Sequence, residues 1–239
     1  MGKKMVVSNI QVDVIKKDIK NMHLAVYPPN GKVRLATPMG VNDDTIRLFT
    51  ISKLGWIKKQ QRKFNEQHRQ SSRKYVNRES HYFFGKRYLL KVIEEDRPSR
   101  VEIKGKARIE LHVKPNSTIE QRHSIMSEWC REELKKVAST IFPKWEKKMG
   151  VSIDTWGIRQ MKTKWGTCNQ ESKRIHLNLE LSKKPIQCIE YIVVHELVHL
   201  FERNHNEQFK AYMDKYLPNW KSIRNDLNRL PVSHVDWEY

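Results

Sequence analysis

Residues 191–205 read YIVVHELVHLFERNH and place three histidines and a glutamate in an otherwise apolar run. The helix that carries this run should begin at Pro185, whose missing N–H costs nothing in a first helical turn. Apolar residues recur at helical spacing at Ile186, Ile189, Val193, Leu197 and Leu200. The stretch therefore predicts a buried helix, and its histidines are either chance members of a core or a metal site.

His195, Glu196 and His199 form the pattern HExxH on this predicted helix. Positions i and i+4 lie on one helix face, so both imidazoles can reach one ion. Catalytic zinc is bound by three protein ligands and a water. The glutamate can take a proton from that water without occupying a coordination position. We therefore expect His195 and His199 to be metal ligands and Glu196 to be the general base.

Two histidines do not complete a catalytic zinc site, so a third ligand is needed. His205 is the main candidate, because residues 202–204 can form a helix exit that turns the chain back. Glu202 is a weaker rival, since it lies before that turn. The alternative is a core helix with chance histidines. Burying two unpaired imidazoles and a carboxylate would be costly, which argues against that alternative.

The composition favours polyanionic partners. The 239 residues include 46 Lys and Arg against 27 Asp and Glu, which gives a net charge of +19. Such an excess suits DNA, RNA or nucleotides, and a solvated basic surface is the alternative. The three cysteines are too few and too widely spaced for a disulfide framework. Because no apolar run could span a bilayer and no signal peptide is evident, we expect a cytoplasmic protein with no membrane partner.

The first half of the chain has the pattern of a β-rich region. Short runs within residues 1–115 alternate apolar and polar positions, and turn signals such as PPNG at 28–31 separate them. Helical spacing over residues 42–67 predicts one long helix with a basic outer face. We therefore expect a β-rich N-terminal part, 1–115, of antiparallel strands with a long helix. The sequence shows no internal repeat.

The second half, residues 116–239, should form a separate catalytic domain. A long helical pattern is followed by two predicted strands, 152–164 and 174–181. In the second strand aliphatic residues alternate with polar ones, which predicts one buried face. The metal helix comes next. The fold class expected for the whole chain is therefore α+β.

Polar residues on the predicted strands are candidates for substrate binding, since these strands directly precede the metal helix. They are Arg159, Lys162, Lys164, Arg174, His176 and Asn178. The four cations could cradle a triphosphate or steer nucleic acid, and they could equally be an ordinary solvated strand face. The histidine and asparagine could line the cleft, although such residues are more often merely exposed.

Four stretches together resemble the YgjP-like metallopeptidase family, which is related to the SprT-like and Wss-type zinc peptidases. They are KWGTCN at 164–169, IHLNLEL at 175–181, Pro185 and YIVVHELVHLFERNHNEQF at 191–209. The resemblance extends to the strand-rich beginning of the chain and covers nearly all of it. It implies a small zincin-like core, in which an HExxH helix packs against a short antiparallel sheet.

The resemblance also implies a ligand set and an activity. Zinc, or another divalent metal, would be held by His195, His199 and His205, with Glu196 as the general base. We therefore expect a zinc-dependent metallohydrolase, and specifically a metallopeptidase that acts on protein substrates, including proteins associated with nucleic acid.

Two other functions stay open, because a fold does not fix a reaction. A metal-dependent nucleoside triphosphate pyrophosphatase, acting on a substrate such as UTP, could use the same metal with the basic residues binding phosphate. A nucleic-acid-binding module with structural zinc would normally need four protein ligands, and the sequence offers no good fourth one.

Overall fold

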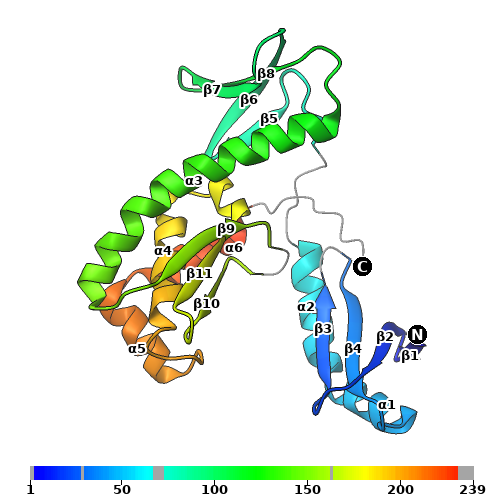
Figure 1. Ribbon diagram of the computed structural model, residues 1–239. Helices are drawn as coiled ribbons and strands as arrows, with labels where there is room; N and C mark the ends of the chain where they lie inside the picture. Colours follow the sequence, from blue (N-terminus) through cyan, green and yellow to red (C-terminus); the bar gives the residue numbers. More distant parts are fainter. Residues whose placement is uncertain (1–2, 28–29, 67–72, 162–163, 231–239) are drawn as a thin grey trace. The chain divides into compact units, whose positions relative to one another are not determined.

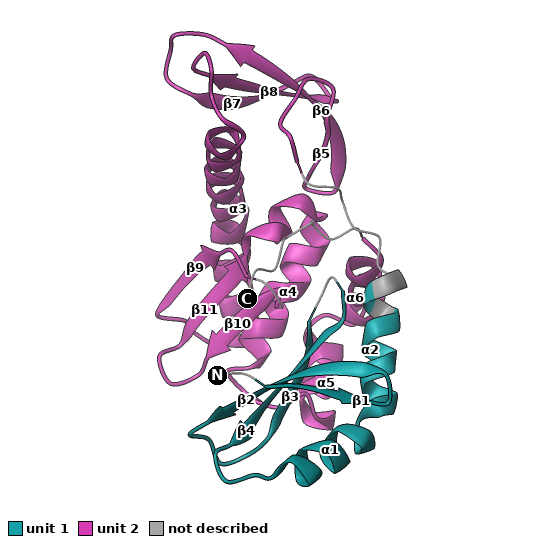
Figure 2. Ribbon diagram, turned by 90° about the vertical axis from the view of Figure 1, so that its right-hand side faces the viewer, with its two compact units in different colours: residues 1–70, 234–239 teal, residues 71–233 magenta. Residues whose placement is uncertain are grey.

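The computed structural model of the chain describes residues 3–27, 30–66, 73–161 and 164–230 (Figure 1). Contacts divide the chain into two compact units, one of residues 1–70 with 234–239 and one of residues 71–233 (Figure 2). Both units contain helices and sheets, so the predicted α+β class is confirmed. The predicted domain boundary after residue 115 stays a prediction, and it falls inside the second unit.

The first unit is a four-stranded sheet with two helices. Its strands are β1 (Lys3–Val7), β2 (Ile10–Lys17), β3 (His23–Tyr27) and β4 (Lys32–Pro38), in the order β1-β2-β4-β3. Its helices are α1 (Asp43–Ser52) and α2 (Leu54–Glu66). Alternate side chains of β2 and β4 pack with Ile46 and Ile57 from the helices, which gives this unit an apolar core of its own.

The single helix predicted over residues 42–67 is wrong, because α1 and α2 are separate helices. Lys53 leaves helical geometry between them, with φ −105° and ψ 3°. The hydroxyls of Thr50 and Ser52 donate to carbonyls of the preceding turn, at Ile46 and Phe49. Such back-bonding bends helices, which accounts for the interruption here.

The second unit begins with a sheet of the same topology. Its strands are β5 (Ser80–Phe83), β6 (Lys86–Glu94), β7 (Arg100–Lys104) and β8 (Arg108–Val113), in the order β5-β6-β8-β7. In both sheets the outer pairs are antiparallel and the middle pair is parallel. The antiparallel strands predicted for residues 1–115 therefore form the outer pairs of both sheets, and the parallel middle pairs were not predicted. The third strand of each sheet lies at the edge, and the fourth returns into the middle.

The two sheets also share their first turn. Each opening hairpin closes with two residues of positive φ, Ser8 and Asn9 in the first unit and Phe84 and Gly85 in the second. Turns of this kind match the twist of hairpin strands. A helix follows the fourth strand in both cases. The structure thus contains a repeated sheet-and-helix arrangement that the sequence does not show, since many residue types satisfy the same strand order.

A long helix, α3 (Ile119–Met149), leads from this sheet to the C-terminal part of the second unit (Figure 1). Thr118 and Gln121 close its first turn with a capping box. Gly150 ends it in the left-handed conformation, with φ 70°. Its buried side chains belong to the main core of the unit, which also contains the apolar residues of the helix that carries HExxH.

The remaining elements surround one buried helix, α4. They are β9 (Thr155–Arg159), β10 (Gly166–Asn169), β11 (Arg174–Asn178), the 3-10 turn η1 (Leu179–Lys183), α4 (Ile186–Val198), α5 (Glu207–Tyr216) and α6 (Trp220–Arg229). The strands lie in the order β10-β11-β9, and α4 contacts α3, β10, β11, α5 and α6. None of the described helices has the length and apolar character needed to cross a bilayer.

The strands predicted over 152–164 and 174–181 are shorter in the structure. The second one ends at Asn178, whose side chain accepts a hydrogen bond from the backbone N–H of Glu180 at 3.1 Å. This bond caps η1, so the alternating residues that follow form a 3-10 turn and not a strand. The first prediction also includes residues 162 and 163, which lie outside the described residues.

Candidate metal centre

The helix α4 presents two histidines on one face. His195 lies in its last turn, and His199 is the residue that caps its C-terminus. Their ring centroids are 5.0 Å apart. The helix is fixed by buried apolar side chains on its other sides, at Ile189, Val193, Val194, Leu197 and Val198. The i and i+4 spacing therefore brings the two imidazoles together, as HExxH predicts.

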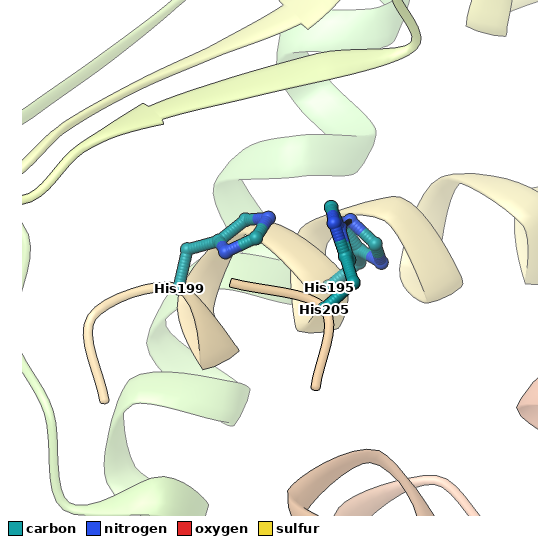
Figure 3. A group of neighbouring side chains, drawn as sticks. All are labelled: His195, His199 and His205. Atoms are coloured by element: carbon teal, nitrogen blue, oxygen red, sulfur yellow. Dashed lines mark hydrogen bonds between the residues drawn. The ribbon is translucent and has the colours of Figure 1, made fainter. Parts of the chain in front are cut away.

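His205 returns to the same place after the chain turns between α4 and α5 (Figure 3). Its Nε2 lies 2.9 Å from Nε2 of His195, and its ring centroid lies 4.7 Å from that of His199. One nitrogen from each of the three rings lies within 4.8 Å of the other two. Glu202 is not a member of this group, and its carboxylate accepts a hydrogen bond from the backbone N–H of Asn204 at 3.0 Å.

Phe209 forms the apolar floor of the three-histidine group. Its ring centroid lies 4.6 to 4.9 Å from the centroids of all three imidazoles, and its side chain is buried. Asn206 caps α5 by accepting from the backbone N–H of Phe209 at 3.0 Å. Sequence analysis gave Phe209 no role. Asn206 is of a residue type that favours the start of a helix such as α5. The contacts of the Phe209 ring with the histidines depend on how the chain turns between α4 and α5, which the sequence does not determine.

The donor set fits a divalent metal such as zinc. Nδ1 of His199 lies 3.1 Å from the carbonyl oxygen of Glu202, so a proton there leaves Nε2 of that ring free for an ion. Nε2 of His195 and Nε2 of His205 point at each other. The remaining nitrogen of His195, Nδ1, is buried without a hydrogen-bond partner among the described residues. Three imidazole nitrogens thus converge from two segments of the chain.

The protonation of the three rings also suits a metal. Burial is the largest cause that lowers the pKa of His195, to about 3, followed by the neighbouring imidazoles of His199 and His205. Burial likewise lowers the pKa of His199 and of His205. At neutral pH all three rings are therefore neutral, which is the form that binds metal.

Glu196 is buried beside this group, with 5% of its surface exposed. Burial raises the pKa of its carboxyl to about 8, and the charge of Lys164 partly opposes that rise. The backbone of β10 runs directly against the side chain: a Cβ atom on Gly166 would lie 2.5 Å from Oε1 of Glu196. Gly166 lies in the KWGTCN stretch, but sequence analysis gave it no role. Only glycine fits here without moving the carboxylate.

Asn178 holds the loop that precedes β10. Its Nδ2 donates to the carbonyl oxygens of Met161 and Lys164, at 2.8 and 2.7 Å. Its Oδ1 accepts from the backbone N–H groups of Met161 and Glu180, at 3.3 and 3.1 Å. The side chain is buried, and these four bonds direct it at the backbone. Its contact with a substrate stays a prediction.

The three-stranded sheet separates Arg159, Arg174 and His176, three of the predicted substrate-binding residues, from the helix α4. Gly166 and Cys168 lie on the face towards α4. The backbone of Gly166 lies against the Glu196 side chain, and burial followed by the charge of Glu196 raises the pKa of Cys168. His176 pairs across the sheet with Gly157 and lies one position away from the buried residues of β11, so it lies on the opposite face. Arg159 and Arg174 share that face. Burial is the largest cause that lowers the pKa of His176, and the charges of the two arginines lower it further.

The charges of two cations contribute to the low pKa values of the three histidines. Lys164 is exposed. Burial is the largest cause of the pKa shifts of Glu196 and His199, and the charge of Lys164 is a smaller cause that lowers both pKa values. Burial is also the largest cause that lowers the pKa of His195 and of His205, and the charge of Arg224 on α6 lowers both pKa values further. Lys162 lies outside the described residues. The effect of Arg224 on these pKa values could not be predicted from the sequence, because the position of this residue depends on how α6 packs against α4.

Comparison with known proteins gives a family match. Residues 20–230 match the YgjP-like family, described as a YgjP-like, metallopeptidase domain. A search of curated proteins found no match. Among solved structures, the metallopeptidase zymogen jannalysin of Methanocaldococcus jannaschii matches with 22% identity over 39% of this chain and 92% of that chain, at a TM-score of 0.32. The zymogen abylysin of Pyrococcus abyssi matches with 21% identity over 42% and 90%, at 0.31. Likeness at these scores supports no conclusion about activity.

Proposed function

The chain belongs to the YgjP-like metallopeptidase family, and we propose that it is a zinc-dependent peptidase whose metal is held by His195, His199 and His205. The observation that carries the proposal is the convergence of one nitrogen from each ring within 4.8 Å. Three neutral imidazoles leave a fourth position open, which is the ligand set of catalytic zinc. The family supports a peptide or protein substrate.

Glu196 is the general base in this proposal. Zinc bound by the three histidines would supply a Lewis acid that makes a water molecule more acidic. Burial raises the pKa of the Glu196 carboxyl to about 8, so its ionised form is a stronger proton acceptor than an exposed carboxylate. It accepts a proton from the attacking water and returns it to the leaving amine. Its fixed place against Gly166 keeps the carboxylate in position for both transfers.

The strand β10 supports an extended peptide as the substrate. It is one of the two edge strands of its sheet, and it passes the Glu196 carboxylate at Gly166. Edge strands can pair through their backbone with a further strand, such as a bound peptide. A peptide paired with β10 would run past the general base. We also propose that α4 with this sheet is a zincin-like core within a catalytic domain of residues 116–239.

Hydrolysis of a nucleoside triphosphate is the second candidate, and it depends on cations near the metal. Arg159 and Arg174 lie on the sheet face opposite the metal helix, and Lys164 is the predicted phosphate-binding residue whose charge acts on Glu196. Pyrophosphate release from a panel of nucleoside triphosphates tests this candidate. Substitution of Arg159 and Arg174 by Gln should leave any such release unchanged, whereas Lys164→Gln should reduce it.

A structural zinc in a nucleic-acid-binding module is the third candidate. Structural zinc sites are normally closed by four protein ligands. Among the described residues, the group that could hold an ion contains three histidines. Nucleic acid could still be a partner of the enzyme, since Lys58, Lys59 and Arg62 lie exposed on α2. The salt dependence of binding to an oligonucleotide would test that partnership.

The experiment that tests the peptidase assignment uses the zinc-loaded chain and a mixture of unstructured peptides. Cleavage is read by mass spectrometry beside the Glu196→Gln variant. We expect both proteins to bind zinc and the variant to lose about 100-fold or more in turnover. Full activity in the variant would remove Glu196 from this role. Release of pyrophosphate without cleavage of any peptide would replace the first candidate by the second.

A further inference from the structure

The turn between α4 and α5 brings His205 to the other two histidines without apolar packing of its own. Residues 203–208 are exposed, and His205 is among them. Glu202, at the start of the turn, is half-buried, and Phe209, after it, is buried. An exposed segment loses conformational freedom when it is ordered, so it needs contacts that hold one conformation. The hydrogen bonds of this turn therefore decide where His205 lies.

The backbone of Glu202 is fixed to the end of α4 and to one of the histidines. Its N–H donates to the carbonyl oxygen of Val198 at 3.1 Å. Its carbonyl oxygen lies 3.1 Å from Nδ1 of His199. A proton on Nδ1 that is donated to this oxygen leaves Nε2 of the ring for an ion. The position of Glu202 is therefore set by the helix that carries the first two histidines.

The carboxylate of Glu202 contacts both chain neighbours of His205. Its Oε1 accepts from the backbone N–H of Asn204 at 3.0 Å. The side chain of Asn206 also forms a hydrogen bond with this carboxylate. The same Asn206 side chain caps α5, because its Oδ1 accepts from the backbone N–H of Phe209 at 3.0 Å. One carboxylate thus joins the end of α4 to the residues on either side of the third histidine.

His205 itself is the central residue of a tight turn. The backbone N–H of Asn206 donates to the carbonyl oxygen of Asn204 at 2.8 Å. A hydrogen bond between residues two positions apart closes a γ-turn, which leaves the central side chain at its tip. Both residues that close this turn are the ones that Glu202 holds. The direction of the His205 ring therefore depends on the Glu202 carboxylate.

We propose that Glu202 is a positioning residue of the metal centre, whose carboxylate places His205 beside the two histidines of α4. The proposal rests on the metal site of the peptidase function proposed above. The carboxylate supplies hydrogen-bond acceptors to the turn, whereas the three imidazoles supply the atoms that converge within 4.8 Å. Without these acceptors the exposed turn would occupy several conformations. Ordering it upon metal binding would then reduce the affinity for zinc.

Three roles of Glu202 predict three different results for the affinity for zinc. If Glu202 were a ligand, both Glu202→Ala and Glu202→Gln would lose affinity. If Glu202 positions His205, only Glu202→Ala loses affinity, because the amide oxygen of glutamine can still accept from the N–H of Asn204. If the carboxylate had no role, neither variant would lose affinity. The comparison of the two substitutions therefore separates the three roles.

The test measures the affinity of the metal-free full chain for zinc, by competition with a chromogenic chelator. Glu202→Ala and Glu202→Gln are compared with the parent, and Glu202→Ala is also combined with His205→Gln. Glu207→Ala is the matched control, because it removes an exposed carboxylate two residues after His205 that pairs with Lys210 at 2.5 Å. Thermal unfolding of the metal-free proteins checks that every variant is folded. Peptide cleavage is not part of the readout, so failure of the peptidase assignment would leave the result unaffected.

We expect Glu202→Ala to weaken zinc binding by about tenfold or more, the loss typical of an outer partner of a ligand. Glu202→Gln and Glu207→Ala should bind zinc within a few-fold of the parent. In the His205→Gln background Glu202→Ala should cause almost no further loss, since the imidazole that it positions is gone. Parental affinity in Glu202→Ala, or an equal loss in both backgrounds or in both Glu202 variants, would overturn the proposal and leave the three-histidine site intact. A parent chain that binds no zinc would overturn this proposal together with the metal site.

Discussion

The backbone at Gly166 lies directly against the carboxylate of Glu196, because a Cβ atom at position 166 would come within 2.5 Å of Oε1. The strand β10, at one edge of its sheet, and the helix α4 therefore meet at Glu196, without a side chain of residue 166 between them. This contact excludes water from one side of the carboxyl, and burial is what raises its pKa to about 8.

The first prediction concerns Gly166. In Gly166→Ala the new methyl group should displace the Glu196 carboxylate, because the glycine backbone conformation is acceptable for alanine but the space is not. We expect turnover to fall by about 10- to 100-fold while zinc still binds, since misplacement of a catalytic group by about 1 Å has that effect. Gly157→Ala is the control in the same sheet, because its Cβ would lie 3.5 Å from His176. Equal activity of both variants would contradict the contact.

The second prediction decides between His205 and Glu202 as the third ligand. His205→Gln should weaken zinc binding by at least about 100-fold, more than the loss of an outer partner of a ligand. Glu202→Gln should bind zinc within a few-fold of the parent, since its carboxylate serves the backbone N–H of Asn204. Competition with a chromogenic chelator measures both affinities. A larger loss in the Glu202 variant would reverse the assignment.

The third prediction concerns the stability of the metal-free protein. The Glu196 pKa is raised in the folded chain to about 8, above its ordinary value of 4.5. Its neutral form therefore supports the fold fully below pH 4.5, and that contribution is lost as the pH rises to 8. Relative to Glu196→Gln, the parent should lose on the order of 3 kcal/mol between pH 4.5 and 8. Urea unfolding of both metal-free proteins at several pH values measures this, and parallel curves would contradict the burial of the carboxyl.

The fourth prediction concerns the clamp formed by Asn178. Asn178→Ala removes four hydrogen bonds to the backbone, so the loop before β10 loses its anchor. We expect a loss of about 1–3 kcal/mol in the free energy of unfolding. His176→Ala is the control on the same strand, and it should change stability by about 0.5 kcal/mol at most. Similar losses in both variants would mean that the clamp is not the cause.

The approach of His195 and His199 to one another could be predicted, because one local pattern decides that geometry. HExxH fixes His195, Glu196 and His199 on a helix, because helical spacing alone brings positions i and i+4 together. His205 required a turn of the chain, which residues 202–204 allowed but did not dictate. The structure brings it to the other two, within 4.8 Å.

Other residues could not be predicted because their roles depend on packing. The effect of the Arg224 charge on the pKa of His195 and His205 depends on the contact between α6 and α4, and the approach of Gly166 to Glu196 depends on the contact between β10 and α4. The alternation of β11 indicated two faces, but not which face the metal helix would cover. The position of Arg174 and His176 on the far face therefore had to come from the structure. The parallel middle pairs of both four-stranded sheets are equally a matter of long-range pairing.

The most direct test of the central claim is a zinc titration of the metal-free chain, with peptide cleavage as the readout. If three histidines hold one ion and Glu196 serves the water beside it, activity should rise linearly and stop at one zinc per chain. Glu196→Gln should take up the same single zinc and remain inactive at every point of the titration. Cleavage without zinc, or full cleavage by the Glu196→Gln variant, would contradict the account.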